Sequence, residues 1–325
     1  MKSQAELLVN PVVSIVVPVF RSEKTLRELS LRITKVMEVL EPSFELIFIE
    51  DSGGDRSWEI IREMAAEDHR IRGINFSRNF GQHAATICGF SASKGAWVIT
   101  LDDDLEQAPE DIPALYERAL QGADLVYGVY SERTHSAWRN ISSATARWMF
   151  SKAIPSLNYS YTSYRVVRGD IARALSQFDS PYPFVDGYLS WLTNNYATVP
   201  VAHDIRGHGT SNYTLRKLIT HTVNIFVTFS DLPLRAASWL GFLAFLGGGG
   251  WLLVIFLSFL SGGVTVSGYA SIMAGILAFG GVQLLMLGVF GEYLGRINFK
   301  SSRKPLYLIK EDSRVGASSD SKRSD

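Results

Sequence analysis

Short apolar runs alternate with stretches of helical spacing along the first 130 residues of the chain. Residues 12–19 form a nearly unbroken β-branched run, which is typical of a strand buried on both faces. From 26 to 40, apolar residues recur every three or four positions, which predicts an amphipathic helix. The alternation continues and predicts strands at 44–49, 71–76, 96–101 and 125–129, helices around 58–65 and 84–92, and a helix that begins at Pro109-Glu110.

This alternation predicts an α/β fold with a parallel sheet, right-handed crossovers and helices on both faces. Ligands of such sheets bind beyond the carboxyl ends of the strands. Polar clusters follow three of the predicted strands, at 20–23, 50–51 and 102–106. We therefore expect the functional site at that edge.

The pattern changes after Arg235, because residues 236–291 include no charged side chain. A helix that crosses a bilayer needs about 20 apolar residues. We expect two transmembrane helices, at 236–260 and 269–291, joined by the turn 261–268. A buried core hairpin is the alternative. The glycines at 247–250 would permit close packing of these helices.

Residues 215–226 carry an apolar face beside Arg216 and Lys217, which predicts a helix in the membrane interface. A core-packed helix is the alternative, and a second interfacial helix would include residues 229–234. The predicted organisation is a catalytic domain at 1–209, interfacial helices at 210–234, two transmembrane helices at 235–295 and a tail at 296–325. We expect the tail, rich in Ser, Asp, Lys and Arg, to be disordered from about 312.

Charge and cysteine content narrow the class of protein. The 325 residues include 32 basic and 32 acidic side chains, whereas a nucleic-acid binder normally has a basic excess. The single cysteine, Cys88, excludes an intramolecular disulfide and a cysteine-based zinc site.

Residues 1–10 contain no apolar core of a secretory signal peptide. Basic residues flank the predicted spans on both sides, which predicts a multi-pass plasma-membrane protein with a cytoplasmic catalytic domain.

Three adjacent carboxylates at 102–104, followed by Glu106, are the main candidate chemistry. Such carboxylates repel one another, and a divalent cation relieves that repulsion. Oxygen ligands suit Mg²⁺ or Mn²⁺, which also bind phosphate oxygens. The residues indicate a metal–diphosphate site, with a solvated acidic turn as the alternative. The chain contains neither G-x-G-x-x-G nor a P-loop sequence.

Four motifs resemble the inverting glycosyltransferases of family 2. They are Val-Val-Pro-Val-Phe-Arg-Ser-Glu at 16–23, Glu-Asp-Ser-Gly-Gly-Asp at 50–55, Ser-Arg-Asn-Phe-Gly-Gln-His at 77–83 and Asp-Asp-Asp-Leu-Glu-Gln-Ala-Pro-Glu at 102–110. The resemblance is to the polyprenyl-phosphate group, which includes dolichyl-phosphate mannose synthase and the bactoprenol glucosyltransferases. It implies a GT-A fold, a nucleotide-sugar donor taken to be a UDP-sugar, Mg²⁺ or Mn²⁺, and transfer to polyprenyl phosphate for cell-envelope glycans.

The resemblance also implies roles on the donor side. Asp51 would hydrogen-bond the nucleobase, Asp102 would lie near the ribose, and Asp104 would bind the metal together with Glu106, where relatives often have Gln. The implied donor-binding residues are Pro18, Phe20, Glu23, Asp51, Arg78, Asp102 and Asp103. The usual Asn after the first strand is Arg21 in this chain, so no role is carried over to it.

On the acceptor side, residues 206–217 resemble the family's R-x-x-G-x-S-x-Y segment, and their cations could bind phosphate. Relatives often have an Asp, a conventional general base, where this chain has Ser163. Asp186 is an alternative carboxylate for that role. The competing interpretation of Asp186 is a solvated Asp at the start of a helix. A lipid phosphate with a second pKa of about 6 needs no base. The predicted catalytic residues are Asp104, Asp186 and Arg206, and the predicted acceptor-phosphate residues are Arg165, Arg206, Ser211, Arg216 and Lys217.

Two other functions stay open at this point. A processive polysaccharide synthase usually has Q-x-x-R-W, but Ala144 stands where the Gln would precede Arg147-Trp148. A non-catalytic membrane protein that binds nucleotide sugars is the other alternative. The expected partners are the nucleotide sugar, the polyprenyl phosphate and the membrane, without nucleic acid, and a homo-oligomer remains open.

Overall fold

The structure is a computed structural model that describes residues 11–130, 161–178, 183–201, 232–261, 268–302 and 304–316. The chain divides into two compact units. The first contains Met1–Thr214 and Pro305–Asp325, and the second contains Leu215–Lys304. We call them the catalytic unit and the helical unit, and describe each by itself.

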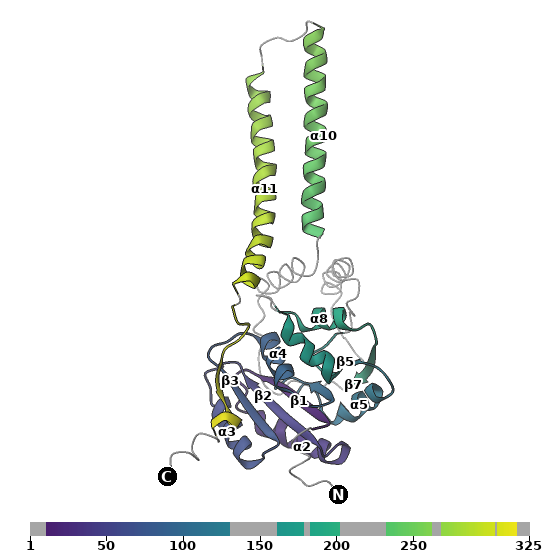
Figure 1. The fold of residues 1–325 in the computed structure, drawn as a ribbon, viewed down its shortest axis with the longest axis vertical. Coiled ribbons are helices and arrows are strands. Elements are labelled where there is room, and N and C mark those ends of the chain that lie inside the picture. Colours follow the sequence, from purple (N-terminus) through teal and green to yellow (C-terminus); the bar gives the residue numbers. More distant parts are fainter. Residues whose placement is uncertain are drawn as a thin grey trace. The chain divides into compact units, whose positions relative to one another are not determined.

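The catalytic unit is built on an eight-stranded sheet with the order β7-β5-β6-β4-β1-β2-β3-β8 (Figure 1). Its centre is parallel: β1 (Val13–Val19) pairs with β2 (Phe44–Glu50) and β4 (Trp97–Thr100), and β2 pairs with β3 (Ile71–Phe76). These strands and β5 (Leu125–Tyr130) confirm the five strands predicted from the apolar runs. Their continuous burial is what a parallel sheet covered on both faces requires.

Helices cover both faces of the sheet, as predicted (Figure 1). One face carries α2 (Leu26–Leu40), α3 (Ser57–Glu67) and α5 (Ile112–Leu120), which follows the 3₁₀ turn η1 (Pro109–Asp111). The other carries α4 (Gln82–Ala92), α7 (Gly169–Ala174), η2 (Leu175–Gln177) and α8 (Val185–Leu192). On α4, Gly89 lies so close to β1 that an added Cβ would be 2.1 Å from a methyl carbon of Val16.

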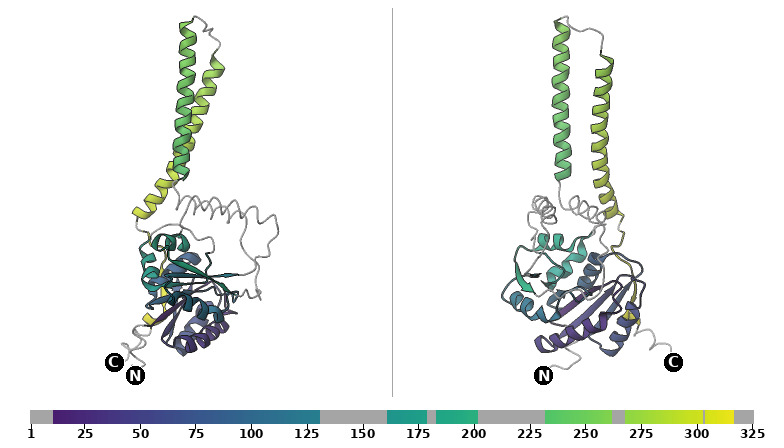
Figure 2. Two further views of the ribbon diagram at one scale, coloured as in Figure 1. Left: turned by 90° about the vertical axis from the view of Figure 1, so that its right-hand side faces the viewer. Right: turned by 180° about the vertical axis from the view of Figure 1, so that it is seen from behind.

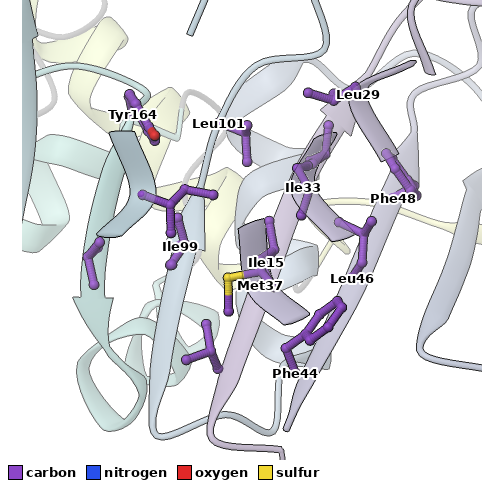
Figure 3. Close-up of a cluster of buried hydrophobic side chains, with 14 of the residues drawn as sticks. Ile15, Leu29, Ile33, Met37, Phe44, Leu46, Phe48, Ile99, Leu101 and Tyr164 are labelled. Carbon is purple, nitrogen blue, oxygen red and sulfur yellow. The ribbon is translucent and has the colours of Figure 1, made fainter. Parts of the chain in front are cut away.

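Side chains from α2 and the central strands form the main core, shown in Figure 3. Leu29, Ile33 and Met37 of α2 recur at helical spacing and are fully buried. They pack over Ile15 and Leu46, which point to this face because side chains alternate along a strand. The alternation predicts which residues are buried here, and the core fixes the strand ends that carry the polar clusters.

The sheet is mixed, which refines the prediction of a parallel sheet. β6 (Arg165–Arg168) lies antiparallel between β4 and β5, and β7 (Tyr196–Val201) adds a parallel edge strand next to β5. Neither strand was predicted. β6 has only four residues and ends in a charged side chain at each side, so its apolar content is too small to be recognised before its neighbours are known.

The opposite edge of the sheet is completed by β8 (Ile309–Asp312), which lies antiparallel to β3 and leads into α12 (Ser313–Gly316). Glu311 accepts a hydrogen bond from the Trp58 indole at 3.0 Å, and Asp312 forms a salt bridge with Arg72 at 2.6 Å. The ring of Tyr307 stacks on Phe76. Ordered structure therefore continues to Gly316, which corrects the prediction of disorder from about 312.

We expect Asp312→Asn to lower the free energy of unfolding by roughly 1–3 kcal/mol, because Arg72 keeps its charge with only 18% of its side chain exposed. Chemical denaturation of the full chain in detergent would measure this loss. The matched control is Asp170→Asn, since the Asp170 side chain is 63% exposed beside Arg168 and should contribute less than about 0.5 kcal/mol. Equal losses for the two variants would contradict the importance given to the β8 salt bridge.

The helical unit contains α10 (Leu232–Leu260) and α11 (Tyr269–Ser301), which run alongside each other in Figure 2. Among the described residues, one segment, Leu234–Ser258, is long and apolar enough to cross a membrane, and α11 contributes the shorter apolar stretch Phe279–Gly295. Gly248 permits the predicted close packing, because an added Cβ would lie 2.5 Å from the Phe279 ring. A second crossing stays a prediction, and the predicted interfacial helices up to residue 231 lie outside the described residues.

Candidate active site

The carboxyl ends of β1, β2 and β4 bring three of the sequence motifs together, as predicted. The loops that follow these strands are the β1 loop (20–25), the β2 loop (51–56) and the β4 loop (101–108). Each contains a residue with positive φ: Arg21 at 60°, Ser52 at 53° and Leu105 at 64°. No other non-glycine residue in the described part of the chain has positive φ. Each loop thus turns sharply as it leaves its strand.

Asp103 joins the β4 loop to the β1 loop. Its carboxylate accepts hydrogen bonds from the Phe20 amide at 2.8 Å and from the Ser22 hydroxyl. The Thr25 hydroxyl donates to the Asp103 carbonyl at 2.6 Å. Burial raises the pKa of Asp103 to about 6. The middle carboxylate of the triplet therefore holds two loops in register, and its predicted contact with the donor stays a prediction.

Asp102 accepts hydrogen bonds from three side chains, one in its own loop and two from elsewhere in the fold. It accepts hydrogen bonds from the amide of Gln82 on α4 at 2.6 Å, from the amide of Gln107 at 2.9 Å and from the Ser163 hydroxyl. Gln107 also accepts the backbone N–H of Asp102 at 2.9 Å. Burial raises the pKa of Asp102 to about 6, and the neighbouring carboxylates of Asp104 and Asp103 add to this shift.

Asp104 and Glu106 remain the candidates for the metal. Both are partly exposed, and the Glu106 amide donates to Asp104 Oδ1 at 3.1 Å. The described residues contain no group of three or more His, Cys, Asp or Glu side chains that could hold a metal ion. The donor set nevertheless fits Mg²⁺ or Mn²⁺, because Mg²⁺ is commonly held by one or two carboxylates together with substrate phosphates and water. Asp104 and Glu106 supply that number of carboxylates.

Asp51 connects the end of β2 to the loop before α4. It is buried, and its carboxylate accepts the backbone N–H of Phe80 at 2.6 Å and of Gly81 at 2.8 Å. Burial raises the pKa of Asp51, although these two hydrogen bonds oppose the shift. The residue predicted to bind the nucleobase is therefore held by backbone amides, which fixes the direction of its carboxylate.

The other predicted donor residues lie around the same edge. Pro18 is buried within β1, whereas the Phe20 side chain is 43% exposed. Glu23 is exposed and accepts the Arg56 amide at 3.2 Å. The guanidinium of Arg78, also exposed, lies over the Phe80 ring at 4.7 Å from its centroid. The structure brings these residues to one edge of the sheet, and their contacts with a nucleotide stay predictions.

Arg165 and Asp186 form a buried salt bridge with each other. Asp186 also accepts a hydrogen bond from the Tyr127 hydroxyl at 3.0 Å, and Arg165 Nε donates to the Thr100 hydroxyl at 3.1 Å. Burial excludes the solvated Asp considered above, whereas the catalytic role of Asp186 and the acceptor role of Arg165 stay predictions. The pair braces β6 against α8.

Four predicted acceptor residues, Arg206, Ser211, Arg216 and Lys217, lie outside the described residues. Sequence reasoning missed the roles of Gln82 and Gln107, which orient Asp102. Both stand inside the motifs at 77–83 and 102–110, so the motifs themselves were the available signal.

Several known proteins are similar to this chain over most of its length. The chain matches the family described as "Glycosyl transferase family 2" over residues 14–167. It is 31% identical to the uncharacterized glycosyltransferase YkcC of Bacillus subtilis strain 168, over 92% of this chain and 93% of that one. It is 33% identical to the undecaprenyl-phosphate 4-deoxy-4-formamido-L-arabinose transferase of Pseudomonas aeruginosa strain LESB58, over 91% and 89% of the two chains.

A further relative with the same transferase name, from Aeromonas hydrophila subsp. hydrophila, is 34% identical over 91% of this chain and 92% of that one. Among solved structures, glucosyl-3-phosphoglycerate synthase from Mycobacterium tuberculosis in complex with uridine diphosphate aligns with a TM-score of 0.49 and 19% identity. That alignment covers 70% of this chain and 83% of the synthase, a likeness too slight to identify a ligand.

Proposed function

Because the chain belongs to glycosyltransferase family 2, and is thus a glycosyltransferase, we propose that it transfers a sugar from a nucleotide-diphosphate donor to a polyprenyl phosphate. The observation that carries this proposal is the one-third identity, over nine-tenths of the chain, to transferases named for undecaprenyl phosphate. A UDP-sugar donor and action at the cytoplasmic face of the plasma membrane belong to the same proposal. The apolar segment Leu234–Ser258 supports the membrane location.

In this proposal the loops of β1, β2 and β4 bind the donor with its diphosphate beside Asp104 and Glu106. These two carboxylates would hold Mg²⁺ or Mn²⁺, which offsets the charge of the departing diphosphate when bound. Asp102 faces the donor in a direction set by Gln82 and Gln107. The lipid phosphate attacks the anomeric carbon as the bond to the diphosphate breaks, and the electron pair of that bond leaves with the nucleoside diphosphate.

Attack by a phosphate explains how the chain functions with Ser163 in place of the family's Asp. A phosphate monoester has a second pKa of about 6, so its attacking oxygen is already deprotonated near pH 7. A sugar hydroxyl would instead need a positioned base. The Ser163 hydroxyl donates to Asp102 and accepts from Gln107 at 2.7 Å, so the position serves to orient Asp102.

The test is product analysis with the purified full chain in detergent, given Mg²⁺, undecaprenyl phosphate and a panel of nucleotide sugars. We expect one donor to yield a lipid-linked monosaccharide by mass spectrometry, together with one equivalent of nucleoside diphosphate. A polymer would identify a processive polysaccharide synthase instead. Nucleotide-sugar binding without turnover of any donor would identify a non-catalytic binding protein.

A further inference from the structure

Arg21 occupies a backbone conformation that most side chains avoid. Its φ of 60° lies in the left-handed region, which costs an L-residue other than glycine roughly 1–2 kcal/mol and is best tolerated by Gly, Asn or Asp. The backbone conformation therefore disfavours an arginine at this position. The reason for an arginine here has to lie in the contacts of its side chain.

The base of the Arg21 side chain is held against the β2 loop. Its Nε donates to the Gly53 carbonyl at 2.9 Å, while the Gly53 amide donates to the buried carboxylate of Glu50 at 2.6 Å. An added Cβ on Gly53 would lie only 2.7 Å from the Arg21 backbone nitrogen. The guanidinium carbon lies 5.2 Å from the centroid of the exposed Phe20 ring. These contacts fix where the guanidinium lies.

Among the described residues, the terminal nitrogens of Arg21 make no hydrogen bond and no ion pair. A guanidinium has five N–H donors, and in the described part of the chain this one makes a single hydrogen bond and no ion pair. Glu50 at the end of β2 is bonded by the amides of Ser52 and Gly53, and Asp55 in the β2 loop is bonded by the Glu23 amide and by Ser57. Within the described part of the chain, no salt bridge accounts for the arginine.

Arg21 consequently presents an exposed, orientated cation between Phe20 and the β2 loop, at the sheet edge that carries Asp51 and Asp104. The guanidinium fork matches oxygen acceptors of phosphates and carbonyls. We propose that Arg21 binds the nucleotide part of the sugar donor directly and contributes to the choice of nucleotide. This inference rests on the proposed function. The group that Arg21 would bind is an oxygen acceptor, which both the nucleobase and the diphosphate offer.

The experiment measures nucleotide binding to the full chain in detergent by calorimetry, with Mg²⁺ and UDP, UMP or uridine as the probes. Arg21→Asn removes the cation and keeps a residue suited to positive φ, so folding should be unaffected. We expect UDP to bind roughly 10- to 100-fold more weakly to this variant, as expected for the loss of hydrogen bonds from a charged group. The KM for the donor should rise with it, and the KM for the lipid should stay within about threefold.

Lys24→Asn is the matched control, because it removes the same charge from the same loop at an exposed position. A loss of affinity in Arg21→Asn that also appears with uridine identifies the nucleobase as the group bound. A loss of affinity confined to UDP identifies the diphosphate. Both results support the proposal. Unchanged UDP affinity in Arg21→Asn, an equal loss in Lys24→Asn, or a matching fall in thermal stability would overturn it. If the wild type binds none of these nucleotides, the UDP donor itself is refuted.

Discussion

Asp104→Asn is expected to lower the rate of sugar transfer by roughly a thousand-fold or more. In the proposed function, Asp104 and Glu106 are the partly exposed carboxylates that would hold the divalent ion, and neutralising the diphosphate contributes several kcal/mol to the transition state. Each 1.36 kcal/mol lost slows the reaction about tenfold. The initial rate of lipid-linked product formation at saturating donor measures the effect. Excess chelator should inhibit the wild type to a similar degree, and added Mg²⁺ should restore it.

The matched control for this prediction is Asp103→Asn. It makes the same chemical change at the neighbouring residue, but Asp103 is bonded to the Phe20 amide and the Ser22 hydroxyl. Its loss should loosen the β1 loop and lower stability, with transfer falling much less than in Asp104→Asn. Full activity of the wild type in excess chelator would refute the metal role of Asp104. A larger loss of transfer rate in Asp103→Asn than in Asp104→Asn would assign the metal role to Asp103 instead of Asp104.

Asp186→Ala is expected to lower the free energy of unfolding by about 3–5 kcal/mol, because it leaves the charge of Arg165 buried without its partner. The two side chains are 3% and 5% exposed, so water cannot replace the lost carboxylate. The double variant Arg165→Met with Asp186→Leu should recover roughly half of this loss or more, since apolar pairs of similar volume often replace buried ion pairs without penalty. Denaturation of the full chain in detergent measures all three proteins.

A milder substitution at the same position, Asp186→Asn, decides whether Asp186 takes part in the reaction. If the pair is structural, the folded fraction of Asp186→Asn should keep its turnover within about tenfold, because the proposed lipid-phosphate acceptor needs no base. A fall of several orders of magnitude, with stability and acceptor affinity intact, would show that a carboxylate base acts here after all. A double variant no more stable than Asp186→Ala would count against the pair as a brace of β6 and α8.

The centre of the fold was predictable because its signals are local. Strands β1 to β3 are apolar enough to be recognised without their neighbours, and the stripe on α2 is complete within one helix. The strands that were missed depend on distant partners. In β8, the residues Ile-Lys-Glu-Asp resemble a solvated tail until β3 and the partly buried Arg72 are placed beside them.

The motifs predicted which residues lie at one edge of the sheet more than what each one contacts there. Asp102, Asp103 and Asp104 as neighbours of the donor stay a prediction, and three adjacent carboxylates look alike in a sequence. Their directions depend on the sharp turn at Leu105 and on the donors that each one meets. The contact of Asp186 was likewise not predictable from the sequence, because its partner Arg165 is brought to it only by the pairing of β6 with β4.

The edge strand β8 also sets an order of events on the ribosome. At about 5–20 residues per second, the roughly 230 residues between Phe76 and Ile309 take on the order of 10–50 s to synthesise. Until then β3 is the last strand of the nascent sheet, and an open strand edge readily pairs with other chains. Both α10 and α11 are made in this interval. With the proposed membrane location, their insertion begins before the sheet can close, and nascent chains at one site of insertion are most exposed to mispairing during that time.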